Sequence, residues 1–185
     1  TGTLAYSTQY YWKVVAVSEG GSAQNCPVWS FTTFADPRIT ALPYSQNFDS
    51  ITAPALPFGW STYVSSTGGS AYVKNYSSPT NFALSPPNCI SFNNFTDTSA
   101  ELILITPEIL TPLNIMRLKF SARGYASGYG LQVGTMSSPT GTFNSLTTIN
   151  LTNTMQQYSV SFSGYSGTDR FLAIKHNLGG ANRII

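Results

Sequence analysis

Few side chains in this sequence could carry out catalysis. His176 is the only histidine, and it ends a run that alternates like a β-strand, where a lone histidine is usually a packing or surface residue. Neither cysteine, Cys26 or Cys89, has a histidine near it in the sequence to activate it as a nucleophile. The acidic residues are spread singly, so only folding could bring two of them to the separation that a glycosidase needs. These patterns predict a chain that is not an enzyme.

Carbohydrate binding has better candidates. Sugar-binding β-proteins present aromatic rings beside amide and hydroxyl groups, which stack on pyranose rings and hydrogen-bond to them. Tyr125 and Tyr129 flank the glycine-rich stretch GYASGYG, and Tyr72 and Tyr76 lie in the long 63–98 segment. The alternative is that these tyrosines cover the edges of a sandwich, as tyrosine commonly does. We expect Trp60 to belong to the core.

The two cysteines are too few for a disulfide framework. Cys26 stands in a turn-like stretch, and Cys89 follows two prolines. A bond between Cys26 and Cys89 is one prediction, and two buried or free thiols are the alternative that the sequence leaves open.

Composition and charge narrow the class of protein. Hydrophobic residues make up 42% of the chain, but charged residues only 9%, against roughly 25% in average proteins. The net charge of +2, with lysine and arginine scattered singly, excludes a nucleic-acid partner. No apolar run approaches the roughly 20 residues that span a bilayer, so we expect no membrane insertion. The composition favours a secreted β-protein, and because no signal peptide is visible, we expect an internal piece of a longer chain.

The elements that must position any site are predicted to be short strands. MRLKFSA (116–122) and QYSVSFSGY (157–165) alternate apolar and polar residues, which is the strand period. AELILIT (100–106) is apolar on both faces, as in a central strand covered on both sides. GLQVG, TTINL and RFLAIKH give further strands, and clusters of Gly, Pro, Asn and Ser separate them. The pattern indicates an all-β chain that folds as a β-sandwich.

The first 34 residues differ from the rest. Tyr10, Trp12, Val14 and Ala16 alternate along one long strand, and VWSFTT follows a Gly-Gly turn. Leu4 precedes Tyr10 at the spacing of a tyrosine corner, in which the hydroxyl bonds the backbone a few residues upstream. Residues 1–34 resemble the last two strands of a fibronectin type III domain. Residues 35–41 then read as a Pro-containing linker.

The rest of the chain carries a second set of ordered motifs. A strand ending in Phe-Asp leads to PFGW (57–60), and LITP (104–107), MRLKFSA, LQVGTMSSPTGTFNSLTTINL and FLAIKH follow. In this order the motifs resemble a MAM-like jelly-roll module, the kind called cleaved adhesin or choice-of-anchor J in secreted surface proteins of Bacteroidota. The match covers 42–185. The family usually closes with an acidic strand, which should begin at ANRII, so we expect a sandwich cut before its last strand.

The resemblance implies a function and a location. Such modules are non-catalytic stalk or binding segments of large secreted or cell-surface bacterial proteins, which act in adhesion or surface display. Their partners are extracellular proteins or glycans and the neighbouring domains of the same chain, and many leave the cell by type IX secretion. An accessory region of a secreted hydrolase, with its catalytic domain elsewhere, is the alternative. Fold alone does not decide between them.

The resemblance also implies a metal site near the first strand. Modules of this kind often bind structural calcium there, and Asp49, from the Phe-Asp motif, is the position that carries over. Calcium takes six to eight oxygens, so a single carboxylate would need other donors. No other cofactor is expected. Asp49, Ser50 and Ile51 resemble the acceptor of O-glycans in Bacteroidota, which makes Ser50 a possible glycosylation site.

Overall fold

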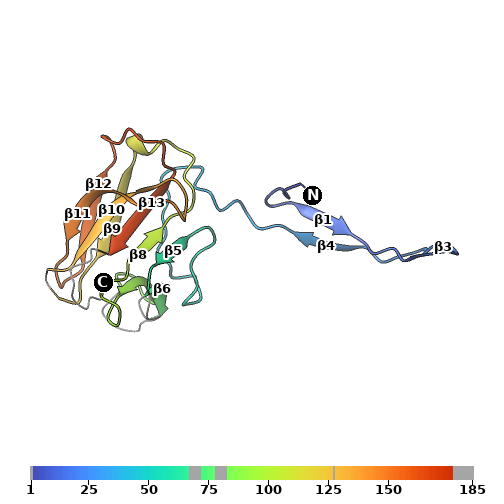
Figure 1. The fold of residues 1–185 in the computed structure, drawn as a ribbon, viewed down its shortest axis with the longest axis horizontal. Helices are drawn as coiled ribbons and strands as arrows, with labels where there is room; N and C mark the ends of the chain where they lie inside the picture. The colour runs from blue at the N-terminus through green and yellow to red at the C-terminus, as the bar shows by residue number, and fades with distance from the viewer. Residues whose placement is uncertain (1, 67–71, 78–82, 127, 177–185) are drawn as a thin grey trace. The chain divides into compact units, whose positions relative to one another are not determined.

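The computed structural model describes residues 2–66, 72–77, 83–126 and 128–176. Every regular element in these ranges is a β-strand, except for one 3₁₀ turn, η1 (Leu113–Ile115). The all-β class predicted from the alternating runs is therefore confirmed. The chain divides into two compact units, Thr1–Pro37 and Arg38–Ile185 (Figure 1). No helix in the described ranges has the length and apolar character to cross a membrane.

The first unit is a pair of antiparallel ladders. The outer ladder joins β1 (Gln9–Trp12) to β4 (Trp29–Thr32), and the inner one joins β2 (Val17–Ser18) to β3 (Gly21–Ser22). The sequence predicted one strand running through Ala16, which is wrong, because the described pairing stops after Trp12 and resumes at Val17. The segment between β3 and β4 explains the break, because Asn25 has a φ of +56° and Pro27 has no N–H to donate.

Tyr10 fixes the start of this unit. The backbone N–H of Ala5 donates a hydrogen bond to the phenolic oxygen of Tyr10 at 2.8 Å, which confirms the bond that the spacing of Leu4 and Tyr10 predicted. On the same face the ring of Trp12 stacks on that of Trp29, with centroids 4.7 Å apart. These two indoles are 49% and 43% exposed, so the aromatic face is only half-covered.

The second unit is built on a five-stranded antiparallel sheet in the order β11-β10-β13-β8-β5. Its strands are β5 (Ser61–Val64), β8 (Leu102–Ile105), β10 (Gly130–Met136), β11 (Asn144–Asn150) and β13 (Phe171–His176). A two-stranded sheet of β9 (Arg117–Ala122) and β12 (Gln156–Ser161) packs against it, and β6 (Tyr72–Ser77) pairs with β7 (Asn88–Asn93). The predicted β-sandwich architecture is present.

The core lies between the two sheets. Val133 and Leu172 of the large sheet pack against Val160 and Phe162 from the β12 side, and Leu102 and Leu104 of β8 form a second cluster nearby. The alternation in MRLKFSA and QYSVSFSGY holds, because Leu118, Phe120 and Tyr158 pack inward between polar neighbours. Phe162 is 0% exposed, and truncating such a side chain to alanine costs about 3–5 kcal/mol.

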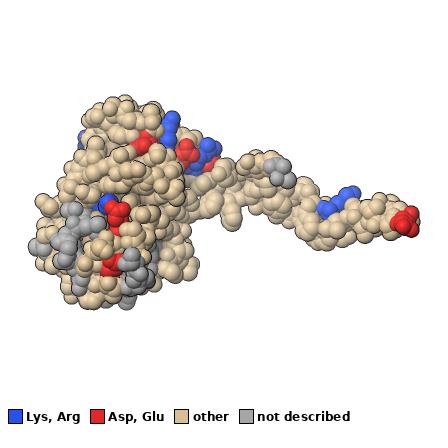
Figure 2. Space-filling model, viewed as in Figure 1, with Lys and Arg blue, Asp and Glu red and all other residues tan. Residues whose placement is uncertain are grey.

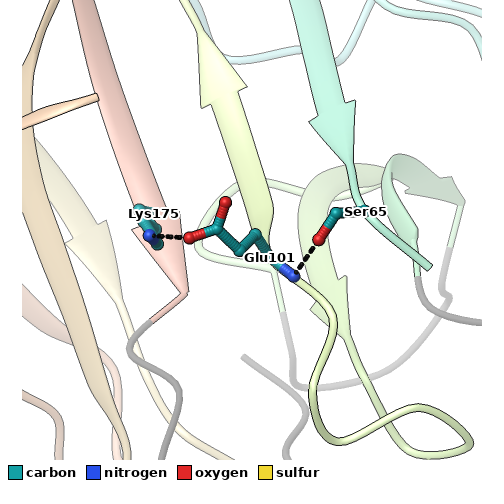
Figure 3. A network of polar contacts seen from close by, with 3 residues as sticks. All are labelled: Ser65, Glu101 and Lys175. Atoms are coloured by element: carbon teal, nitrogen blue, oxygen red, sulfur yellow. Dashed lines mark hydrogen bonds and ion pairs between the residues drawn. The ribbon is translucent and has the colours of Figure 1, made fainter. Parts of the chain in front are cut away.

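Strand β8 is buried on both faces, as predicted for a central strand. Its outer face carries Ile103 and Ile105, which are 3% and 0% exposed and pack with Phe143 and Phe171. At the start of the strand, Glu101 forms an ion pair with Lys175 of β13, and its N–H donates to the hydroxyl of Ser65 at 2.9 Å (Figure 3). The polar network ties the β5, β8 and β13 ends of the sheet together.

The linker predicted for 35–41 ends earlier than its composition indicates. Ile39 is 5% exposed and forms a parallel bridge with Ile109. Its N–H donates to the carbonyl oxygen of Glu108 at 2.8 Å. Ile39 therefore belongs to the second unit. Its side chain is buried in the core, and its backbone N–H and carbonyl oxygen are both hydrogen-bonded.

Candidate ligand-binding groove

A groove of about 420 Å³ lies between β11 and β12. Within the described residues, each of these strands is the last strand of its own sheet, so the groove opens between two strand edges. The groove is a depression that is largely open to solvent. The groove is lined by Leu146, Thr147 and Ile149 of β11 and by Tyr158, Ser159, Val160 and Ser161 of β12.

Leu146 reaches the groove because of a β-bulge. Val133 pairs with Thr147, but the next residue, Gly134, pairs with Ser145, so Leu146 has no partner across the ladder. A bulge adds one residue to its strand and turns that side chain to a new direction. Leu146 is accordingly 41% exposed at the groove.

Asp169 fixes the chain just before the bulge. Its carboxylate accepts hydrogen bonds from the hydroxyl of Thr135 at 2.6 Å and from the side-chain amide of Asn144 at 3.0 Å. Burial alone would raise the pKa of Asp169, but hydrogen bonds with Thr135, Asn144 and Tyr165 outweigh burial and hold the pKa below its ordinary value. The charged carboxylate thus anchors Asn144, two residues before Leu146.

The side chains that line the groove are apolar or carry hydroxyl groups. Its apolar surface comes from Leu146, Ile149 and Val160, and its hydroxyls from Ser159 and Ser161, both exposed. In the described part of the chain, no histidine, cysteine or carboxylate lines it. Because successive side chains of a strand point to opposite faces, Ser159 and Ser161 lie on the outer face of β12, while Tyr158 and Val160 line the groove from the core side.

The tyrosines predicted for sugar binding lie elsewhere. Tyr125 is 64% exposed in the loop between β9 and β10, and Tyr129 is half-buried against the core. The backbones of Tyr72 and Tyr76 belong to β6, but their side chains lie outside the described residues. Neither Tyr125 nor Tyr129 lines the groove, and a common tyrosine surface stays a prediction.

None of the residues considered for catalysis lines the groove. His176 is 0% exposed at the end of β13. Cys26 and Cys89 are half-buried and lie in different units, and burial raises the pKa of the Cys89 thiol; a bond between the two stays a prediction. Trp60 is half-buried against the core, as expected, and its indole N–H donates to the hydroxyl of Tyr44 at 3.1 Å.

Asp49 lies in a corner rich in oxygen atoms. The side-chain amide nitrogen of Asn88 lies 3.1, 3.3 and 2.7 Å from the carbonyl oxygens of Phe48, Asp49 and Ile51. Asn88 is 5% exposed, and its own amide oxygen is buried without a hydrogen-bond partner. The carboxylate of Asp49 accepts from the side-chain amide of Asn47 at 2.8 Å.

This donor set fits calcium in kind. Carbonyl and carboxylate oxygens are ligands that calcium takes, although the three carbonyls face the amide nitrogen of Asn88 and not its unpartnered oxygen. In the described ranges, no group of three or more histidines, cysteines and acids could hold a metal ion, so a site around Asp49 would rely largely on uncharged oxygens. Calcium would be held here by Asp49 and the neighbouring carbonyls, in place of the contact that the Asn88 amide nitrogen makes with them. Ser50, the possible glycosylation site, is exposed in the adjoining turn.

Sequence reasoning missed the groove residues. The alternation in QYSVSFSGY places Ser159 and Ser161 correctly on the polar side of a strand. It does not show that β12 is the last strand of its sheet and faces β11. One signal was present: a glycine inside a strand pattern often marks a bulge, and Gly134 stands inside GLQVGTM.

Comparison with known proteins supports the fold. The chain is similar to the K1 cleaved adhesin domain of Lys-gingipain from Porphyromonas gingivalis W83, with a TM-score of 0.52, 19% identity, and coverage of 70% of this chain and 87% of that one. It is less similar to a family 11 carbohydrate-binding module from Clostridium thermocellum, with a TM-score of 0.46, 10% identity, and coverage of 69% and 85%. No family model and no curated protein matches the sequence. At these identities the likeness shows a β-sandwich fold and nothing finer.

Proposed function

We propose that the chain is a non-catalytic binding segment of a secreted or cell-surface protein and contributes to adhesion or surface display. Its ligand is an extracellular glycan or protein, bound in the groove between β11 and β12. The observation that carries the proposal is the groove itself, where a bulge presents Leu146 beside exposed serine hydroxyls and no reactive group. Structural similarity to a cleaved adhesin domain, over 87% of that domain, supports the same proposed function.

The location follows from composition and surface. Charged residues make up 9% of the chain, and Figure 2 shows a face on which charged side chains are few among uncharged ones. A surface of this kind favours an extracellular β-protein. We also propose that the first unit is the closing strand pair of a fibronectin type III domain, with the bond from Ala5 to Tyr10 as its support, and that it joins the binding unit to further domains.

An array of glycans and extracellular matrix proteins tests this function on the 185-residue chain. Ligands that the array selects would be titrated calorimetrically against Leu146→Ala and against Leu110→Ala. The control is matched, because Leu110 is 40% exposed and lies outside the groove, while Leu146 is 41% exposed within it. Removing apolar surface worth about 1 kcal/mol should weaken binding about fivefold for Leu146→Ala alone. A blank array, or ligands that both variants bind equally well, would contradict the proposal.

A further inference from the structure

We propose, building on the proposed function, that the ligand is an acidic polysaccharide whose carboxylate or sulfate groups are bound by Arg117 and Lys119 at the rim of the groove. Both cations lie on β9, the strand that pairs with β12. Each is exposed and lies on the outer face of β9, alternating with the inward side chains of Leu118 and Phe120.

The register places both cations beside the groove. Arg117 is directly opposite Ser161, and Lys119 is directly opposite Ser159. Both serines line the groove. Directly opposed residues of an antiparallel pair have Cβ atoms about 4.5–5.5 Å apart, so long side chains from β9 reach the position of a ligand that contacts the serines.

These two cations differ from the others in the second unit. Lys175 is paired with Glu101, and Arg170 donates to the carbonyl oxygen of Leu110 at 3.0 Å. Arg38 and Arg123 also have polar or ring contacts. Among the cations whose side chains are described in this unit, only Arg117 and Lys119 have no hydrogen bond or ion pair within the chain. Their charges are therefore available to a ligand.

Spacing makes an anionic ligand favourable. Residues two apart on a strand are separated by about 6.6 Å, so the charges of Arg117 and Lys119 repel each other mildly across water, by about 0.6 kcal/mol. An anionic group that lies between them would offset this repulsion. The guanidinium of Arg117 can bind one carboxylate or sulfate through two parallel hydrogen bonds.

The neighbouring side chains favour a saccharide over an acidic peptide. Ser121, Ser159 and Ser161 carry hydroxyls, and Gln157, opposite Ser121, carries an amide. Hydroxyls both donate and accept, which matches the vicinal hydroxyls of a sugar ring. Leu146 lines the groove and is 41% exposed, so its apolar side chain can contact the C–H face of a ring. Acid, hydroxyl and apolar groups occur together on a uronate or sulfated sugar.

Surface plasmon resonance tests this inference by measuring the affinity of the chain for polygalacturonate, heparin, neutral dextran and poly-L-glutamate. At 50 mM NaCl we expect polygalacturonate or heparin to bind and dextran not to bind. Affinity should fall steeply at 500 mM NaCl, because salt screens exposed charges. Arg117→Gln and Lys119→Gln should each weaken binding about 3- to 10-fold. Lys13→Gln, the same charge change at an exposed position of the first unit, should leave affinity within about twofold.

Each other outcome overturns the inference. Binding that is independent of salt, equal loss in Lys13→Gln, or no binding to either acidic polysaccharide would exclude the cation site. If poly-L-glutamate binds as tightly as the acidic polysaccharides and depends equally on Arg117, the ligand is an acidic protein and not a saccharide. If a neutral glycan binds, and its binding depends on Leu146 but not on Arg117 or Lys119, this inference is wrong and the proposed function is retained. Thermal unfolding of each variant shows whether it is folded.

Discussion

Gly134 and the carbonyl oxygen of Asn144 are so close that a Cβ on the glycine would lie 2.1 Å from that oxygen. The contact occurs at the bulge, where Gly134 pairs with Ser145 and Leu146 is left without a partner. No side chain fits between the two backbones, since real Cβ contacts are never this short. The groove therefore depends on a glycine at position 134.

Gly134→Ala should destabilise the second unit by about 3 kcal/mol or more, because the clash is with backbone and cannot be relieved by a rotamer change. Gly164→Ala is the matched control, because a Cβ there meets nothing within 4 Å, and it should change stability by less than about 1 kcal/mol. Urea unfolding of both variants measures the difference. Similar midpoints for the two would show that the bulge tolerates a side chain.

Asp169 should make stability depend on pH. Its pKa is lowered in the folded state, so its contribution is present above the unfolded pKa of about 3.9 and is lost as the pH falls through the lower folded value. Asp169→Asn should lower the melting temperature by about 2–4 °C at pH 7, since one net hydrogen bond is worth about 1 kcal/mol. This difference from the unaltered chain should shrink toward pH 2.

Melting curves of the two proteins between pH 2 and pH 7 measure that dependence. Glu19→Gln removes an exposed carboxylate of the first unit and serves as the control. A melting-temperature difference for Asp169→Asn that is constant across this pH range would show that its hydrogen bonds do not depend on the charge.

Tyr10→Phe tests the corner of the first unit. Losing the hydroxyl removes the acceptor of the Ala5 N–H, a net loss of about 1 kcal/mol, which is about fivefold in the exchange rate of that amide. Tyr11→Phe is the control, because Tyr11 is 68% exposed on the opposite side of the strand. Hydrogen exchange followed by NMR gives both rates. An Ala5 amide that exchanges equally fast in both variants would remove Tyr10 from this role.

Calcium should raise the melting temperature of the chain by an amount that grows with metal concentration, as for any ligand that binds only the folded form. Asp49→Ala should remove most of the gain, since Asp49 is the charged ligand of the corner around Asn88. Magnesium, which demands a tighter octahedral site, should have a smaller effect. Equal melting with calcium and with chelator would leave Asp49 as a residue that only caps the turn with Asn47.

Much of the fold could be predicted from local patterns. The alternation of Leu118 and Phe120 with charged neighbours, and the double-sided burial of Ile103 and Leu104, follow from the strand period and the hydrophobic effect alone. The hydrogen bond of Tyr10 was also predictable, because its partner lies only five residues away. Interactions of short range leave their signature in the sequence.

The groove could not be predicted in the same way. It depends on β11 and β12 ending different sheets, and on pairing between residues far apart in the sequence. Ile39 was assigned to a linker for the same reason, since its partner Ile109 lies 70 positions later. A strand with a polar face has the same sequence pattern whether that face is open to water or lines a binding site.

The location of ligand binding is tested most directly by NMR, with the ¹⁵N-labelled chain titrated with the tightest-binding glycan of the array. We predict that the amides of Leu146, Thr147 and Ile149 on β11, and of Ser159 and Ser161 on β12, show the largest chemical-shift changes, because these residues line the groove. Largest changes around Tyr125 and Tyr129, or on Lys175 at the far face of the large sheet, would contradict the groove as the binding site.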